Sequence, residues 1–180
     1  RLSTDLFRNM PGCGLVAMLA KQDASTGGAL TTDEIIGHLL LLAWAGYDTT
    51  ASAAAWILHV LADRPDWQSR LREALARAGG DVEAIESGRD LPELEWFLLE
   101  AERMFPSALF FPRIALRDVE LLGYTIPKDM VVFYSPYMSH RDPATFENPN
   151  GFDPDRWNPA HGSKRPSPAK LYGFGGGPRV

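Results

Sequence analysis

Residues 45–50 read AGYDTT and lie in the middle of the most apolar stretch of the chain, from Ile35 to Leu61. A glycine in a helix interior costs about 1 kcal/mol relative to alanine, and Asp and Thr compete with the helix for backbone hydrogen bonds. Placing Gly46, Asp48 and two threonines inside an apolar helix breaks a local rule, and such breaks tend to mark functional or strained sites. Taken alone, the stretch predicts either a functional irregularity or a bend around a satisfied, buried Asp48.

The helix that contains this stretch is expected over residues 32–63, because Thr31 and Glu34 form a capping-box pattern at its start. Its uninterrupted apolar runs are too short to cross a bilayer. A membrane span would also place Asp48 near the bilayer centre, at a cost of roughly 2.5–3.5 kcal/mol. The pattern therefore predicts a buried core helix.

The rest of the chain indicates a mainly α fold with a small β region. Pro65 suits the first position of a second helix, and a further helix is expected over 91–104, before Pro106. Residues 113–135 are rich in β-branched and aromatic side chains separated by turn residues, which predicts a small sheet. Prolines recur through 141–170, so this stretch is expected to be an irregular meander.

The sequence EAER places Glu100 and Arg103 on one helix face, at a spacing of three residues. An exposed pair of this kind contributes less than about 1 kcal/mol, whereas a buried pair needs further partners. Arg156, in the segment FDPDRW, is a candidate third member. Spacing alone leaves both interpretations open.

The chain ends on YGFGGGPRV, residues 172–180. A phosphate-binding loop needs a preceding strand and a following helix with a lysine, and in this sequence no helix follows the stretch and no lysine is in place. The net charge of -5 argues against a nucleic-acid partner. A single cysteine, Cys13, excludes an internal disulfide, and the scattered histidines do not predict a metal site made by protein ligands alone.

Four motifs, taken in order, resemble those of the cytochromes P450, the haem-thiolate monooxygenases. AGYDTT matches the oxygen-activating helix, and EAER followed by MFPS is similar to the E-x-x-R helix. FDPDRW resembles the meander motif, with Asp155 where the family usually has Glu and Trp157 where it usually has Phe. FGGGPRV matches the cysteine loop up to the position before its cysteine. The resemblance begins near residue 10 and implies that residues 1–180 are a single partial domain, the C-terminal part of the P450 fold.

This resemblance implies haem b as the cofactor, with iron held by a cysteine thiolate. The axial cysteine would directly follow Val180. Cys13 has none of the loop's flanking residues, so we do not expect it to replace that ligand. The expected roles in the loop and sheet are packing beside the thiolate for Phe174, N–H groups aimed at the sulfur for Gly175 and Gly177, and haem propionate pairing for Arg179 and Arg113.

On the opposite haem face, the resemblance implies that Ala45 and Gly46 lie over the porphyrin, while Asp48 and Thr49 form an acid–alcohol pair that delivers protons. The expected substrate contacts are Ala45, Ala108, Leu109 and Phe110, of which the last three lie in the segment SALFF together with Phe111. These apolar side chains suggest an apolar substrate, although the same segment also fits a protein core. Glu100, Arg103 and Arg156 would form a buried structural triad that holds the meander and the loop.

The implied activity is insertion of one oxygen atom from O2 into an apolar small molecule. Electrons would come from NAD(P)H through a redox partner, either ferredoxin with its reductase or a flavoprotein reductase, in a cytoplasmic enzyme. Two alternatives stay open. The chain could be a truncated, non-catalytic fragment of such an enzyme, inactive by itself, or a family member that performs isomerisation or dehydration without redox input.

Overall fold

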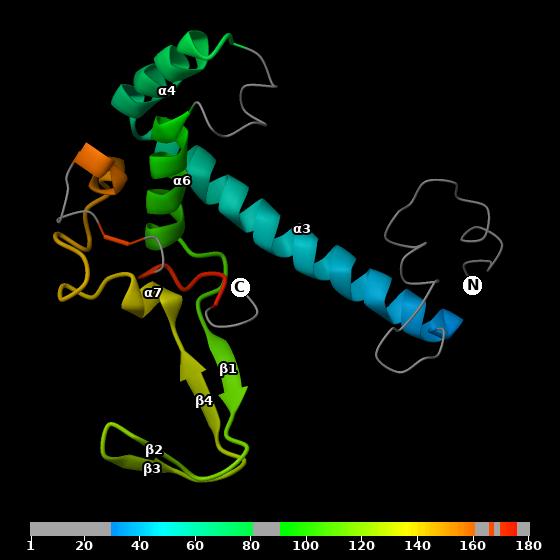
Figure 1. Cartoon of the computed structure of the whole chain (residues 1–180). Helices are drawn as coiled ribbons and strands as arrows, with labels where there is room; N and C mark the ends of the chain where they lie inside the picture. The colour runs from blue at the N-terminus through cyan, green and yellow to red at the C-terminus, as the bar shows by residue number, and fades with distance from the viewer. Residues whose placement is uncertain (1–29, 81–90, 161–165, 168–169, 176–180) are drawn as a thin grey trace. The chain divides into compact units, whose positions relative to one another are not determined.

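The computed structural model describes residues 30–80, 91–160, 166–167 and 170–175. The chain divides into two compact units, Arg1–Asp48 and Thr49–Val180. The boundary falls within the longest helix, α3, which spans Thr32–Ala62 (Figure 1). The predicted capping box is confirmed at its start: the Thr31 backbone N–H donates to Glu34 Oε2 at 2.8 Å, and the Glu34 N–H donates to Thr31 Oγ1 at 3.3 Å.

The expected irregularity at residues 45–50 is not found in α3. The helix is α-helical without interruption through residues 45–50, and Asp48 is exposed. Among its residues only Val60 is buried. A helix is buried only where another element packs on it. In the second unit this occurs in the last turns, where Val60 packs with Trp67 and Phe97.

The helix α4, Pro65–Arg77, begins with the proline that the sequence placed there. Pro suits the first helical position because its missing N–H has no intrahelical partner there. Gly79 and Gly80 follow the helix with φ of 102° and 77°. Glycine adopts this left-handed region without the steric cost that other residues incur, so these two residues end the helix.

The helix α6, Pro92–Met104, is the centre of the second unit and contacts α4, α7 and the 3₁₀ helix η1 (Figure 1). Consecutive residues of α6 serve two different cores. Phe97 packs with Val60 and Trp67, whereas Trp96 packs with Phe146 and Trp157. Because α6 is packed on both of these faces, it fixes the segments on either side of it.

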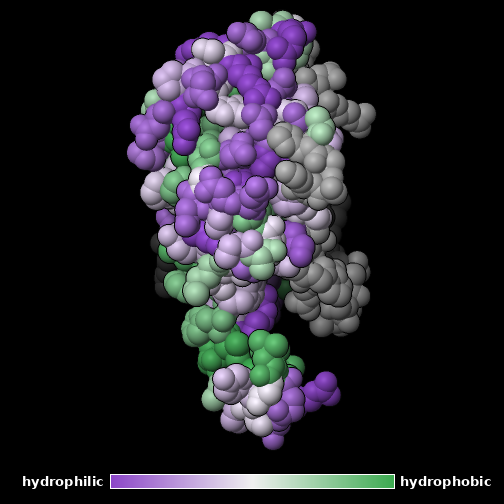
Figure 2. All heavy atoms as spheres, turned by 90° about the vertical axis from the view of Figure 1, so that its left-hand side faces the viewer, coloured by the Kyte–Doolittle hydropathy of each residue, from purple (hydrophilic) through white to green (hydrophobic). Residues whose placement is uncertain are grey.

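In the described residues the β region consists of two separate two-stranded antiparallel sheets, whereas one small sheet was expected. β1 (Phe111–Ile114) pairs with β4 (Val131–Tyr134), and β2 (Val119–Leu121) pairs with β3 (Tyr124–Ile126). The β2–β3 connection is the pair Leu122–Gly123, with φ of 53° and 82°, which suits a tight hairpin turn. Figure 2 shows hydrophobic side chains gathered in the lower part of the view, where these strands lie. Exposed members of this group include Ile114, Leu116, Leu122, Val131 and Phe133.

After β4 the chain forms one short helix and then the expected irregular meander. The helix α7, Pro136–Ser139, is capped by Ser135, whose Oγ accepts from the Met138 N–H at 3.3 Å. Turns follow up to η1, Pro154–Trp157, where the Asp153 side chain caps the start. This meander lies along α6 and supplies most of the partners described next.

Candidate functional site

The Glu100 carboxylate on α6 is the centre of a buried polar network. It is fully buried and accepts five hydrogen bonds. The donors are Arg103 Nε at 2.9 Å and Nη2 at 2.8 Å, the Asp153 backbone N–H at 2.9 Å, Arg156 Nε at 3.1 Å and Trp157 Nε1 at 2.9 Å. A buried charge is tolerated when it is paired and fully hydrogen-bonded, and Glu100 meets both conditions.

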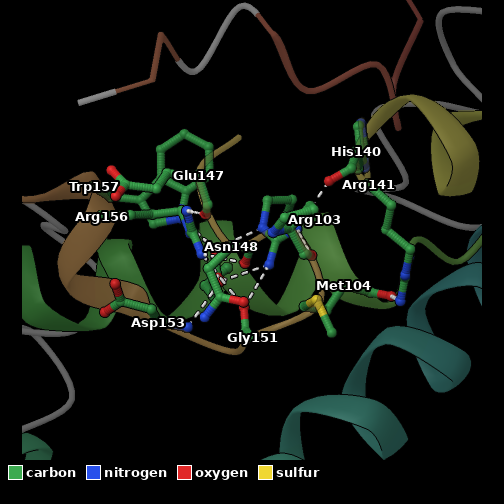
Figure 3. A network of polar contacts seen from close by, with 12 residues as sticks. Arg103, Met104, His140, Arg141, Glu147, Asn148, Gly151, Asp153, Arg156 and Trp157 are labelled. Carbon is green, nitrogen blue, oxygen red and sulfur yellow. Dashed lines mark hydrogen bonds and ion pairs between the residues drawn. The ribbon is translucent and has the colours of Figure 1, made fainter. Parts of the chain in front are cut away.

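The guanidinium of Arg103 points from α6 into the meander and binds three of its carbonyl oxygens (Figure 3). Nη1 donates to His140 O at 2.8 Å and Pro149 O at 2.6 Å, and Nη2 donates to Gly151 O at 2.8 Å. With its two bonds to Glu100, Arg103 uses its whole fork of donors. No lysine can reproduce this pattern with a single ammonium group.

The side chain of Arg156 completes the network from the opposite direction, since it comes from η1. Its Nη1 donates to Glu147 O at 2.7 Å, and its Nη2 lies 3.3 Å from Asn148 O. The structure thus brings together the three residues of the expected triad and adds Trp157, whose role the sequence did not indicate. The only available signal was that a buried tryptophan needs an acceptor for its indole N–H.

A second feature of this unit is an apolar pocket of about 550 Å³. It lies between the second half of α3, the end of α6, the segment after α6 and the glycine-rich segment at 173–174. Its lining consists of Thr49, Thr50, Ala53, Trp56, Ile57, Leu98, Ala101, Glu102, Phe105, Pro106, Ser107, Ala108, Phe111, Gly173 and Phe174. The size and apolar lining suit a largely hydrophobic small molecule or cofactor.

Three expected site residues, Thr49, Ala108 and Phe174, line this one pocket although they come from three different motifs. Leu109 and Phe110 do not line it and are 48% and 60% exposed; the next residue, Phe111, takes a place in the lining. Phe111 belongs to β1 and its ring stacks on Tyr134, and the substrate contacts expected of Leu109 and Phe110 stay predictions.

Of the other expected site residues, the structure describes Arg113 and Gly175 in the second unit, and neither lines the pocket. Arg113 is exposed on β1, where its Nη1 donates to Pro112 O and its guanidinium lies over the Tyr134 ring. Gly175 has φ of 90°, a conformation that favours glycine. Ala45, Gly46 and Asp48 belong to the first unit. Gly177, Arg179, Val180 and Cys13 lie outside the described residues.

Glu102 is an unexpected ionisable group in this apolar lining. Burial raises the pKa of its carboxyl group. The carboxylate lies against the backbone of Gly173, where an added Cβ would collide with Glu102 Oε1. A side chain at position 173 would therefore displace the Glu102 carboxylate from its present place in the lining.

Comparison with known proteins identifies the family. Residues 8–180 match the family model of cytochrome P450, so this chain belongs to the cytochrome P450 family. It is 37% identical to cyclooctatin synthase of Streptomyces melanosporofaciens, over 92% of this chain and 36% of that protein. It is 33% identical to pentalenene oxygenase of Streptomyces avermitilis, over 81% of this chain and 32% of that protein.

Solved structures agree on the fold. A cyanobacterial P450 with bound retinoic acid superposes with a TM-score of 0.80 at 28% identity, over 91% of this chain and 37% of that one. A zebrafish P450 with progesterone gives a TM-score of 0.78 at 27% identity, over 92% and 38%. The expected fold class, a C-terminal part of the P450 fold, is confirmed. The chain spans about a third of the length of the curated relatives named above.

Membership in this family implies haem iron as the cofactor, and the residues present fit it. The pocket is lined mainly by apolar side chains, as a flat macrocycle requires. The segment at its edge places Gly173 and Phe174 beside the cavity. Within the described part of the chain, no cluster of three His, Cys, Asp or Glu side chains could hold a metal ion, and no helix has the length and apolarity to span a membrane.

Proposed function

We propose that the protein carrying this chain is a haem-thiolate monooxygenase that inserts one oxygen atom from O2 into an apolar small molecule. The observation that carries the proposal is the pocket at which Thr49, Ala108 and Phe174 meet. These residues come from the AGYDTT helix, the segment after the E-x-x-R helix and the glycine-rich loop. In a P450, one site needs a proton donor, a substrate wall and a cofactor loop.

The haem, when bound, supplies O2 activation and the electron-rich iron that thiolate ligation provides. The chain's own residues then bind the haem and position the groups around it. Phe174 and Gly175 form the start of the loop that cradles the cofactor. Arg113 and Arg179 are the candidates for its propionates, as charge-assisted donors. The hydroxyl of Thr49 holds a proton at the pocket wall, and the adjacent exposed carboxylate of Asp48 exchanges protons with solvent.

The substrate class is inferred from the pocket lining, which is dominated by apolar side chains such as Ile57, Leu98 and Phe111. The relatives support this class, since one is named for pentalenene and two solved neighbours hold retinoic acid and progesterone. Electrons from NAD(P)H are proposed to arrive through ferredoxin and its reductase or through a flavoprotein reductase. A cytoplasmic location completes the proposal.

The direct test is the reduced, carbon monoxide-treated absorption spectrum of the full-length protein. A red-shifted thiolate band is the expected result, and its absence contradicts the proposal. Sequencing the codons after Val180 is the companion test. A cysteine codon supports a working enzyme, whereas a stop codon there supports the alternative of a truncated, non-catalytic product.

Thr49→Ala tests the proton-delivery role and separates monooxygenation from isomerisation or dehydration. Loss of a positioned proton donor typically costs 10²–10⁴-fold in rate. We expect product formation to fall within that range while NAD(P)H consumption continues and hydrogen peroxide accumulates. Thr49→Ser keeps the hydroxyl and is expected to retain coupling. Unchanged product formation without peroxide in Thr49→Ala argues for the redox-independent alternative.

A further inference from the structure

His140 is a fully buried histidine that the proposed chemistry does not use. It follows α7 directly and lies beneath the glycine-rich segment. Its ring packs against Phe146, at 6.5 Å between centroids, and is stacked near Tyr172, also at 6.5 Å. The sequence alone did not single it out among four scattered histidines.

The imidazole of His140 makes one direct hydrogen bond to the start of the glycine-rich loop. The Tyr172 backbone N–H donates to His140 Nε2 at 2.8 Å. An acceptor nitrogen must carry a lone pair, so the ring is neutral and its proton is on Nδ1. Burial lowers the pKa of His140 to about 4, against the weaker opposing effect of backbone carbonyls. The acceptor form therefore prevails at neutral pH.

The backbone of the same residue belongs to the buried ion-pair network. The His140 carbonyl oxygen accepts from Arg103 Nη1 at 2.8 Å, and Figure 3 shows His140 beside Arg103, joined by this bond. Arg103 in turn binds Glu100. His140 thus has two connections. Its carbonyl oxygen binds Arg103 of α6, and its ring binds the segment at 172–175.

The charges that face His140 act in one direction. Arg103 on α6 and Arg141, the next residue in the chain, both disfavour a positive charge on the ring. Arg141 is itself fixed by its bond from Nη2 to Met104 O at 2.6 Å. Packing and charge together hold the ring in its neutral form against the loop.

We propose that His140 is the positioning residue that transmits the order of the Glu100–Arg103–Arg156 network to the glycine-rich loop, through the hydrogen bond from Tyr172 N–H to His140 Nε2. Phe174 and Gly175 follow Tyr172 by two and three residues, so fixing this amide fixes the entry of the loop into the pocket. The inference about the hydrogen bond stands on the geometry, whereas its consequence for haem ligation rests on the proposed function.

The test compares His140→Gln with His140→Phe in the full-length protein. Gln Oε1 can occupy the place of Nε2 and accept the same bond, whereas Phe keeps the aromatic ring and removes the acceptor. Selective ¹⁵N-tyrosine labelling resolves the tyrosine amides, and the signal that disappears in Tyr172→Phe is the amide of interest. We expect the Tyr172 amide to exchange with solvent about fivefold faster in His140→Phe and at a near wild-type rate in His140→Gln, as loss of one neutral hydrogen bond implies. Equal exchange in all three proteins overturns the proposal.

A measurement on the wild-type protein keeps the proposal testable even if His140→Phe does not fold. ¹⁵N-histidine spectra at pH 5.5 are expected to show one imidazole that is still neutral, with its proton on Nδ1. The absence of any neutral imidazole signal at that pH contradicts the assignment.

Carbon monoxide spectra provide the functional readout. The share of the thiolate band is expected to fall in His140→Phe and to be restored in His140→Gln. If the wild type shows no thiolate band, the proposed function fails while the exchange comparison still decides the role of His140. If the band is unchanged in His140→Phe although exchange accelerates, the link to haem ligation is wrong.

Discussion

At the scale of single residues, Arg103 donates five hydrogen bonds within the buried polar network, as many as Glu100 accepts. Its guanidinium joins Glu100 to the carbonyls of His140, Pro149 and Gly151; Glu100, Arg103 and His140 are fully buried, and the bonds to Pro149 and Gly151 are partly buried. Breaking a buried charge network typically costs 3–5 kcal/mol. The residue is therefore sensitive to geometry as well as to charge.

Arg103→Lys tests this point because it keeps the charge and removes the planar fork. We expect the free energy of unfolding to fall by roughly 3 kcal/mol or more, since several carbonyl acceptors lose their donors. Urea denaturation measures the change. Arg72→Lys on the exposed face of α4 is the matched control and is expected to stay within about 0.5 kcal/mol of the wild type.

Substitution of Glu102 is expected to stabilise the protein at neutral pH, in contrast to Arg103→Lys. Burial raises its folded-state pKa, so the protonated carboxyl is the form that the folded state favours. Its stabilising contribution is present below the unfolded-state pKa and is lost as the pH rises through the folded-state pKa. Glu102→Gln is neutral at every pH and is expected to raise the melting temperature at pH 7 but not at pH 4. Glu95→Gln, an exposed change on the same helix, serves as the control.

At the scale of elements, α4 and η1 are linked by an ion pair that the sequence did not indicate. Arg70 Nη2 lies 2.8 Å from Asp155 Oδ1, and the guanidinium is stacked over the Trp67 ring at 4.3 Å. Asp155 stands at the position where the resemblance gives Glu in the meander motif. Through its ion pair with Arg70 it joins η1 to α4, in addition to the contacts of η1 with α6.

Arg70→Ala is expected to lower the free energy of unfolding by about 1 kcal/mol, because a half-exposed ion pair and a cation–π contact are both lost. The effect should shrink in 1 M salt as the ion pair is screened. Denaturation at low and high salt measures it. Arg72→Ala, two residues along α4, removes a similar side chain without the Asp155 contact, and an equal loss in that variant would contradict the argument.

At the scale of the whole molecule, α6 organises two cores and the polar network, and His140 extends that order to the loop at the pocket. The pH dependence of stability follows from the same arrangement. The pKa of His140 is lowered to about 4, so the folded state resists protonation while the unfolded chain accepts a proton near pH 6.5. The contribution of neutral His140 to the free energy of unfolding is therefore fully present above pH 6.5 and is lost as the pH falls towards 4.

His140→Gln removes this titration while keeping the acceptor. We expect the difference in unfolding free energy between pH 7 and pH 4 to shrink by at most about 3 kcal/mol in the variant. Urea titrations of both proteins at the two pH values measure the difference. An identical pH dependence in both would show that His140 is not neutral in the folded state.

The sequence by itself determined the local features of this protein and its family. The capping box at Thr31, the proline that opens α4 and the spacing of Glu100 and Arg103 depend on neighbouring residues, so they can be read from short segments. Four motifs in order were enough to indicate a P450, which the family match confirmed.

Only the tertiary structure decided which atoms meet. The two separate two-stranded sheets, the indole bond of Trp157 to Glu100 and the bond of His140 to Tyr172 all depend on contacts between segments distant in sequence. Burial and hydrogen bonding across such distances are set by how elements pack, and periodicity within one segment carries no information about its partner. For that reason the motifs indicated the family, while the route by which its network reaches the loop required the folded chain.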